Sequence, residues 1–432
     1  MHKLTPKPYQ VEDAAHIARR SSALVAHQPR VGKTLIGIRA ADLRGAKLAV
    51  VVCPPNVREN WRIAINAGRL TGCTWIVVGD NRVADLLKRI GRRKIDVLIL
   101  DESHRFKNRD SQRTQAVWGQ ECLGFGGIIE HAEAIYCLTG TAMPLNPMDV
   151  WPMLRAIAPD LIMTEKGRPM SYSAFQTRYC RTVNNGFGAK VAGNKNYKEL
   201  KDKLFKSGFV MRRTRKEVFG RDLEPPTTLY VKATKAESAE LAALESSPDG
   251  RRIKEALERG GLTALAKLEK GNTAKLRKLY GLAKVADLAS IIADELNEEP
   301  DLKQVIGFHH RDVGKAYQLA LKKFNPLVFD GSTPADRKIR MNKQFMSEKK
   351  YRVILAQMDA AEVGLDFSSA DFLTIAEAVY VGKTIEQFSS RIFNMQNPNP
   401  KFIRFAALSG STDAAIMAEA QSKLKMSDMI FG

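Results

Sequence analysis

An early segment, Gln28-Pro29-Arg30-Val31-Gly32-Lys33-Thr34, has the residue types of a loop that binds phosphate groups. In such a loop the backbone N–H groups point inward, and the N-terminus of the following helix adds positive potential. Lys33 is expected to contact the β- and γ-phosphates of a nucleotide, and Thr34 to offer its hydroxyl to Mg²⁺. The usual pattern has glycine six residues before the lysine, where this chain has His27. Taken alone, the segment leaves a phosphate-binding loop and a chance Gly-Lys-Thr equally open.

A second segment, Val97–His104, places two adjacent carboxylates at the end of an apolar run. Parallel sheets bind their ligands at such strand ends. Asp101 is expected to hold Mg²⁺, and Glu102 to orient and deprotonate an attacking water. A surface Asp-Glu pair at a strand end is the simpler alternative. The two segments together predict that the chain hydrolyses ATP.

Gly-Lys-Thr occurs a second time, at residues 382–384, and serves as an internal comparison. Glu377 stands at its first glycine position, and no Asp-Glu strand follows it. Thr384 with Gln387 predicts instead a capping box that opens a helix. We interpret the second copy as structural, so the inference of nucleotide binding depends on the acidic strand that follows the first copy.

Short apolar runs alternate with helical patterns in both halves of the chain, which indicates open parallel sheets covered by helices. Residues 232–297 between the halves predict helices, and Pro159–Lys206 predicts a basic, loop-like stretch. The runs that predict buried strands are Ser22–Ala26, Leu48–Cys53, Trp75–Val78, Val97–Leu100, Ile135–Leu138, Lys303–Phe308, Pro326–Phe329, Tyr351–Ala356, Phe372–Glu377 and Phe402–Leu408.

Composition points to a polyanionic partner. The 432 residues include 68 Lys+Arg against 47 Asp+Glu, a formal net charge of +21. Nucleic acid is the commonest partner of such a chain, and a generally basic protein is the alternative.

The five cysteines are scattered and predict reduced core thiols rather than disulfides or a zinc site. We find no signal-peptide core and no run that would span a membrane, so we expect a cytoplasmic protein, at a nucleoid or a viral replication site.

Further segments stand in a fixed order along the chain. They are Pro8-Tyr9-Gln10, Val51–Val57 with Trp61, Asp101–Asn108, Leu138–Pro144, Met211–Val218, Asp330–Thr333, Glu362–Asp371 and Gln387–Arg391. This ordered set resembles the SWI/SNF-like DNA translocases of helicase superfamily 2. Arg178-Tyr179-Cys180, Ala283-Lys284-Val285 and Gly307–His310 are closest to the annealing-helicase branch of that family.

The resemblance implies an α/β fold with two RecA-like parallel-sheet lobes in tandem and helical insertions between them. Lobe 1, the ATP-binding helicase domain, is expected over residues 1–228. A helical inter-lobe region is expected over 229–298, and lobe 2, the C-terminal helicase domain, over 299–432. ATP and Mg²⁺ are the implied cofactors. The implied partner is DNA, duplex or branched, bound by a monomer without membrane contact.

The resemblance also assigns site residues, listed here by role. The catalytic residues are Lys33, Asp101, Glu102, Gln387 and Arg391. Nucleotide contacts are expected from Gln10, Arg30, Val31, Gly32, Lys33, Thr34, Gly364 and Asp366, and the metal contacts from Thr34 and Asp101. Nucleic-acid contacts are expected from Asn56, Arg58, Lys107, Asn108, Thr141, Ser332, Thr333 and Arg337. For each of these residues taken singly, an ordinary turn or a solvated charge is an alternative of at least equal weight.

The chain departs from the family pattern at two sites. Arg30 stands where the family has glycine, and Asn394 stands where the last motif has a second arginine, next to Phe393 in place of histidine. Arg391 must then supply the charge that reaches the nucleotide from lobe 2. The basic run Arg212–Lys216 is expected to bind either DNA or acidic residues at the lobe junction, with equal weight.

The function that follows is an ATP-dependent translocase that moves on duplex DNA and remodels or rewinds branched or protein-bound DNA. A helicase that separates strands of DNA or RNA is the alternative within enzymes. A nucleotide-gated DNA clamp with little hydrolysis is the alternative outside them, and Arg30 and Asn394 are the residues that suggest it.

Overall fold

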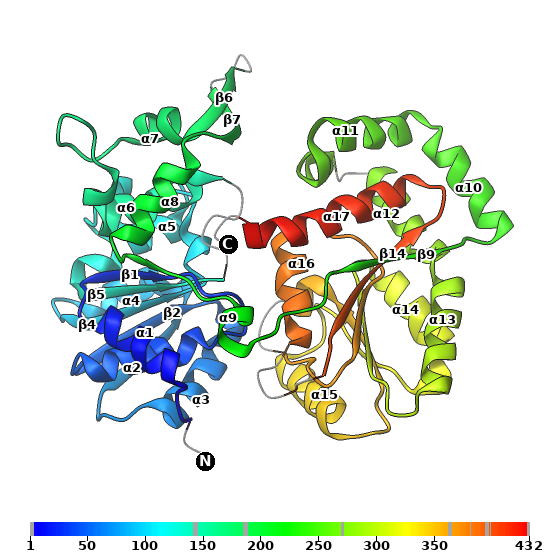
Figure 1. The fold of residues 1–432 in the computed structure, drawn as a ribbon, viewed down its shortest axis with the longest axis horizontal. Helices are drawn as coiled ribbons and strands as arrows, with labels where there is room; N and C mark the ends of the chain where they lie inside the picture. Colours follow the sequence, from blue (N-terminus) through cyan, green and yellow to red (C-terminus); the bar gives the residue numbers. More distant parts are fainter. Residues whose placement is uncertain are drawn as a thin grey trace. The chain divides into compact units, whose positions relative to one another are not determined.

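The computed structural model describes residues 4–140, 146–184, 189–268, 272–361, 365–380, 382–393, 397 and 399–429. These residues form two compact units, the first ending at Gly220 and the second extending from Arg221 to Met429. Each unit has its own sheet and its own hydrophobic core (Figure 1).

Within its described residues, the first unit is built on six parallel strands in the order β3-β2-β4-β5-β1-β8. The central strands are aliphatic because both faces of the sheet are covered, and the side chains of Val50, Val52, Leu98 and Leu100 are fully buried. The strands are β1 (Ser22–Val25), β2 (Leu48–Cys53), β3 (Thr74–Gly79), β4 (Ile95–Asp101), β5 (Ala132–Leu138) and β8 (Val210–Met211).

The order of these strands decides which helices share a face of the sheet. The chain moves outward from β1 to β2 and β3, then returns through β4 to β5. Right-handed crossovers therefore put the connecting helices of the two directions on opposite faces. The helices are α1 (Pro8–Ala18), α2 (Lys33–Leu43), α3 (Arg58–Gly68), α4 (Val83–Ile90), α5 (Gln112–Trp118) and α6 (Trp151–Ile157). Packing agrees, because α2 contacts α1 and α3 whereas α5 contacts α4 and α6.

The prediction of a loop-like stretch over Pro159–Lys206 was wrong. This region contains α7 (Tyr172–Tyr179), an antiparallel hairpin of β6 (Cys180–Asn184) and β7 (Ala189–Asn194), and α8 (Tyr197–Lys206). The α8 residues Leu200 and Leu204 are buried one helical turn apart in the core of the first unit. Polar and basic residues surround this narrow apolar stripe, so the local pattern is weak although tertiary packing stabilises the helix.

The second unit, as far as it is described, repeats the architecture with six parallel strands in the order β11-β12-β10-β13-β14-β9 (Figure 1). The strands are β9 (Thr227–Val231), β10 (Gln304–Phe308), β11 (Leu327–Phe329), β12 (Val353–Gln357), β13 (Phe372–Ile375) and β14 (Phe402–Leu408). The predicted α/β fold with two parallel-sheet lobes is confirmed. The strand Thr227–Val231 pairs with β14, so it belongs to the second sheet.

Helices fill the interval between β9 and β10, as the composition predicts for residues 232–297. They are α10 (Lys235–Glu245), α11 (Pro248–Leu268), α12 (Asn272–Ala283) and α13 (Val285–Glu298). The remaining helices are α9 (Arg215–Phe219) at the end of the first unit, and α14 (Arg311–Ala320), α15 (Ala335–Ser347), α16 (Gly382–Ser389) and α17 (Thr412–Met429) in the second.

All five cysteines are buried and unpaired. Among the helices that the structure describes, none combines the length and the apolar character needed to cross a bilayer.

Candidate active site

The predicted phosphate-binding loop joins β1 to α2, and its geometry explains its glycine. Gly32 has φ 73°, in the left-handed region, and directly precedes α2. A Cβ on Gly32 would lie 2.3 Å from Nε2 of Gln10, so a larger residue would displace that side chain. Gln10 donates through Nε2 to the Gly32 carbonyl at 3.2 Å, and the Tyr9 hydroxyl donates to the Val31 carbonyl at 3.0 Å. The start of α1 therefore holds the loop from one side.

Lys33 and Thr34 begin α2, where phosphate-binding residues are expected. The Lys33 ammonium donates to the carbonyl oxygens of His27, at 2.8 Å, and Gln28, at 3.1 Å. Arg30 has φ 71°. Since this conformation is unfavourable for any residue with a Cβ, the family's glycine at the position of Arg30 has a steric explanation.

The acidic pair lies at the end of β4. The Asp101 carboxylate accepts hydrogen bonds from Nε1 of Trp61 at 2.7 Å and from the backbone N–H of Glu102 at 3.0 Å. Burial, followed by the negative charge of Glu102, raises the pKa of Asp101 to about 6, and the Trp61 hydrogen bond and the Lys33 ammonium oppose that rise. The loop follows β1 and the acidic pair follows β4, so both lie at the same edge of the parallel sheet.

The loop after β4 is attached to the segments that follow β5 and β3, which lie on opposite sides of β4 in the sheet. Nδ1 of His104 lies 2.8 Å from the Thr139 hydroxyl, just after β5, and 3.2 Å from Oε2 of Glu102. On the other side Arg105 donates through Nε to Asp80, just after β3, at 2.5 Å. Both contacts fix the backbone that carries Glu102, whose φ of 50° is itself left-handed.

These donors fit a magnesium ion. Asp101, Glu102 and Thr34 offer only oxygen atoms, which Mg²⁺ prefers, and a buried carboxylate with a raised pKa gains from a nearby cation. In the described part of the chain no three His, Cys, Asp or Glu side chains gather as a metal cage. Mg²⁺ usually binds through one or two carboxylates plus substrate phosphates, so no cage is required. Bound there, the ion would neutralise charge on the nucleotide phosphates.

The predicted nucleic-acid contacts of the first unit follow β2 and β4. Arg58 is exposed, and its Nε donates to the Pro55 carbonyl at 3.2 Å. Lys107 lies 3.5 Å from the Asp149 carboxylate, and Asn108 accepts from the backbone of Asp110 at 3.2 Å. Two further predictions cannot be placed in this way, because the side chain of Asn56 and the whole of Thr141 lie outside the described residues.

The basic run Arg212–Lys216, which extends into the start of α9, contacts acidic residues and the phosphate-binding loop. Arg213 forms ion pairs with Asp13 and Glu12, both at 2.7 Å. Arg212 donates to the Ala26 carbonyl at 3.1 Å. Of the two roles left open for this run, binding to acidic residues is the one that the structure shows for Arg213, and these residues lie on α1.

In the second unit, the structure brings Arg391 close to Asp366. Arg391 donates through Nη1 to the Leu365 carbonyl at 3.2 Å, and its own carbonyl accepts from Phe367 at 2.9 Å. Gln387 lies one turn earlier, at the end of α16. The predicted residue Gly364 and the divergent Asn394 lie outside the described part of the chain.

The remaining predicted contacts of the second unit follow β11. The hydroxyls of Ser332 and Thr333 both contact Oδ1 of Asp330, at 2.6 and 3.3 Å, and thereby form a compact turn. Arg337 is exposed on α15. These residues lie near the C-terminal edge of the second sheet, as the predicted strand positions require.

The capping box predicted at the second Gly-Lys-Thr was wrong. Helix α16 begins at Gly382, so Thr384 lies within its first turn rather than at its N-cap. Glu377, at the first glycine position, is buried and accepts hydrogen bonds from the backbones of His309 and His310. Its carboxylate thus connects β13 to β10.

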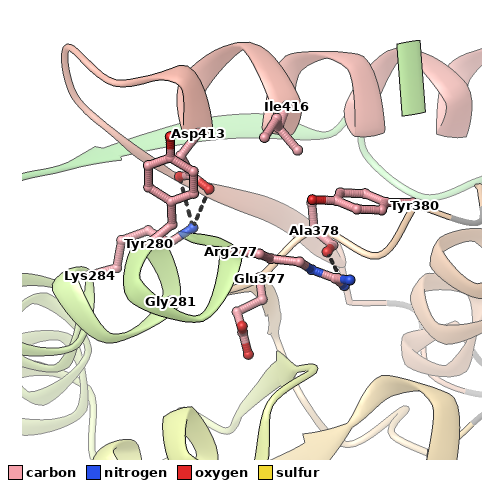
Figure 2. A pocket seen from close by; sticks show the side chains of 9 residues that line it. All are labelled: Arg277, Tyr280, Gly281, Lys284, Glu377, Ala378, Tyr380, Asp413 and Ile416. Atoms are coloured by element: carbon pink, nitrogen blue, oxygen red, sulfur yellow. Dashed lines mark hydrogen bonds and ion pairs between the residues drawn. The ribbon is translucent and has the colours of Figure 1, made fainter. Parts of the chain in front are cut away.

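A small cavity in the second unit is shown in Figure 2. Its volume is about 10 Å³, space for about one water molecule. Arg277 donates to the Ala378 carbonyl, and Lys284 forms an ion pair with Asp413 at 2.9 Å (Figure 2). The cavity is therefore a packed polar junction of α12, α17 and the segment after β13, and it is too small for a nucleotide.

Comparison with known proteins agrees with this geometry. Residues 70–242 match the model of the SNF2-related domain. This part of the chain is therefore similar to the SNF2-related domain. The resemblance to SWI/SNF-like, helicase-like ATPases is thereby confirmed, and the relatives include proteins named as annealing helicases.

Two relatives align over nearly all of this chain. One is the SWI/SNF-related matrix-associated actin-dependent regulator of chromatin subfamily A-like protein 1 of Xenopus tropicalis, with 25% identity over 95% of this chain and 43% of the relative. Another is the DNA annealing helicase and endonuclease ZRANB3 of Mus musculus, with 22% identity over 97% and 40%. The chain spans less than half of the length of either relative.

A solved structure also aligns with this chain. It is the Sulfolobus solfataricus SWI2/SNF2 ATPase core in complex with dsDNA, with 17% identity, a TM-score of 0.44, and coverage of 94% of this chain and 89% of that chain.

Two contacts at the site have no counterpart in the predictions from sequence. Trp61 was noted only as part of a motif, whereas its indole bonds to Asp101. Asp13 and His27 were not predicted to meet, although they lie 2.9 Å apart. The signal for the second contact is an acidic residue at Asp13 beside apolar helix positions, because such a residue needs a buried partner.

Proposed function

We propose that this chain is an ATP-dependent translocase that moves on duplex DNA and remodels or rewinds branched or protein-bound DNA. The supporting observation is that Lys33, which begins α2 after β1, and Asp101, which ends β4, lie at the same edge of one parallel sheet. Relatives named as DNA annealing helicases and the formal net charge of +21 support DNA as the polymer.

The residues divide the work between the two units. Lys33 contacts the phosphates of ATP, and Glu102 orients the attacking water. Arg391 of the second unit supplies positive charge to the γ-phosphate. The family resemblance implies that ATP contacts both units; ATP would then favour one arrangement of the units, and loss of the γ-phosphate would release it. The two units then alternate their grip on the DNA.

The grip acts on the DNA backbone. Arg58, Lys107 and Arg337 carry the charge for phosphate contacts, and the turn at Ser332 offers hydroxyl and backbone groups. Phosphates look the same at every step, so a motor that holds them moves without sequence preference. Its DNA affinity should fall steeply as salt rises.

The first experiment measures ATP hydrolysis with and without duplex DNA. Duplex DNA should stimulate ATP hydrolysis by the parent protein. Lys33→Ala should abolish turnover, and Glu102→Gln should abolish turnover but still bind ATP. Lys383→Ala, in the second Gly-Lys-Thr, is the matched control and should keep parental turnover. Full activity of both Lys33→Ala and Glu102→Gln would refute the site.

The second experiment separates translocation from the two alternatives. ATP-dependent displacement of a third strand from a triplex reports movement along intact duplex. Release of a strand from a forked duplex would instead indicate a strand-separating helicase. DNA retention that depends on ATP, without stimulated hydrolysis, would indicate a clamp.

A further inference from the structure

A buried carboxylate on α1 links the phosphate-binding loop to the end of the first unit. Asp13 is fully buried, and Oδ2 lies 2.9 Å from Nε2 of His27. Arg213 contacts the same carboxylate through Nε, at 3.0 and 2.8 Å, and through Nη2, at 2.7 Å. Three segments that are far apart in sequence thus meet at one side chain.

His27 connects this carboxylate to the lysine of the loop. It occupies the position where the phosphate-loop pattern has its first glycine, and its side chain is fully buried. Its carbonyl accepts the Lys33 ammonium at 2.8 Å. The imidazole is therefore held by α1, while the backbone of the same residue holds Lys33.

Arg213 belongs to a segment that pairs with the loop backbone. The Arg213 carbonyl accepts from Gln28 N–H at 3.0 Å, and the Gln28 side chain accepts from the backbone of Arg215 at 2.7 Å. The Met211 carbonyl accepts from Ala26 N–H at 2.7 Å. This pairing extends the β1–β8 ladder into the loop and fixes its path.

The charges of the cluster match this arrangement. Burial works against the Asp13 carboxylate, but the hydrogen bonds from His27 and Arg213 prevail and hold the pKa of Asp13 below its usual range. Burial, aided by the positive charges of Lys33 and Arg213, lowers the pKa of His27 although Asp13 opposes it. A neutral imidazole then donates from Nε2 to Asp13 at neutral pH.

We propose that Asp13, His27 and Arg213 form a positioning cluster for the phosphate-binding loop, in which anchored His27 takes over the task of the missing glycine. The proposal rests on the ATPase function proposed above. Glycine at this position would allow the loop to approach phosphates by conformational freedom. His27 instead holds the loop by a buried contact, so affinity for ATP depends on Asp13 and Arg213, neither of which is expected to touch the nucleotide.

The test uses substitutions with opposite expectations. His27→Gly restores the usual loop pattern. If the loop requires only a conformationally free backbone at this position, the variant should bind ATP as tightly as the parent or more tightly. The positioning cluster predicts the reverse, with KM for ATP raised about 10-fold and kcat changed little, because a charge-assisted hydrogen bond is lost. Asp13→Asn should have the same effect, and Arg213→Lys should retain part of the affinity.

Asp42 provides a matched control within the same unit. It is a buried aspartate on α2 whose carboxylate accepts from the Leu70 N–H at 2.9 Å and from the Thr71 hydroxyl at 2.8 Å. Asp42→Asn should lower the melting temperature without a change in KM. The equilibrium affinity for a fluorescent ATP analogue is measured in parallel, so that a change in KM is tied to binding.

The outcomes separate this proposal from the function on which it rests. If the parent hydrolyses ATP and His27→Gly keeps parental KM and analogue affinity, the cluster has no positioning role. If Asp13→Asn fails to fold, the His27→Gly and Arg213→Lys variants still decide the question. If the parent itself neither binds nor hydrolyses ATP, the proposed function fails first.

Discussion

Replacing Trp61 with phenylalanine tests the metal-binding assignment of Asp101. The substitution keeps an aromatic ring in a buried site but removes the N–H that reaches Asp101 at 2.7 Å. A hydrogen bond to a charged group contributes about 1.5–3 kcal/mol, which corresponds to about a 10- to 150-fold change in an equilibrium constant. Since this N–H orients the carboxylate, Trp61→Phe should raise the Mg²⁺ concentration needed for half-maximal ATPase activity by at least about 10-fold.

The assay is ATP hydrolysis at saturating ATP over a range of MgCl₂ concentrations, with melting temperatures measured in parallel. Trp118 offers a matched control, because it is also buried in the first unit and its indole N–H donates to the Phe106 carbonyl at 3.0 Å. Trp118→Phe loses a comparable hydrogen bond at a distance from Asp101. It should lower stability and leave the Mg²⁺ dependence unchanged.

The reasoning would be refuted by parallel behaviour of the two variants. If Trp61→Phe and Trp118→Phe lose similar stability and both retain the parental Mg²⁺ requirement, the indole of Trp61 serves packing only. The hydrogen bonds of Asp101 would then give no support to its assignment as a metal ligand.

Further predictions concern the loop and the second unit. Gly32→Ala should raise KM for ATP at least about 10-fold in steady-state assays, because its Cβ meets Gln10 and its φ is 73°. Arg30→Gly should stabilise the protein by about 1 kcal/mol in urea unfolding, because left-handed strain is relieved. His27 is protonated near pH 6.5 in the unfolded chain, whereas burial opposes its protonation in the folded state. The free energy of unfolding should therefore decrease below that pH by up to about 1.4 kcal/mol per pH unit. Urea unfolding at pH 7.5 and 5.5 should show a smaller decrease for His27→Gln than for the parent. Arg391→Ala should lower kcat by about 10³-fold with little change in ATP affinity.

The two sheets were predictable because their strands are short aliphatic runs. Leu48–Cys53 was predicted with the bounds that the structure gives, since a strand buried on both faces leaves little freedom in residue choice. The hairpin of β6 and β7 was missed because its strands mix polar, small and apolar residues without an apolar run, and because its pairing is local. Helix α16 was misplaced by two residues at its start, because capping patterns specify helix ends loosely.

The candidate site was predictable to the extent that strand ends specify it. Asp101 and Glu102 follow an apolar strand, so their place at the edge of the sheet follows from the pattern. The contact between Asp13 and His27 was not predictable, because it joins residues from a helix and a loop whose approach depends on packing. His27 was read from the sequence only as a departure from a motif, whereas the structure gives it a buried partner.

The segment that carries Arg213 continues directly through α9 into the second unit, which begins at Arg221. Tyr9, at the start of α1, contacts both ends of this stretch, with the guanidinium of Arg213 5.8 Å from its ring centre and the ring of Phe219 6.4 Å away. A tension applied to the covalent connection therefore acts within a few residues on the backbone that borders the nucleotide loop. In the proposed translocase, mechanical load and ATP occupancy would consequently act on the same short stretch of chain.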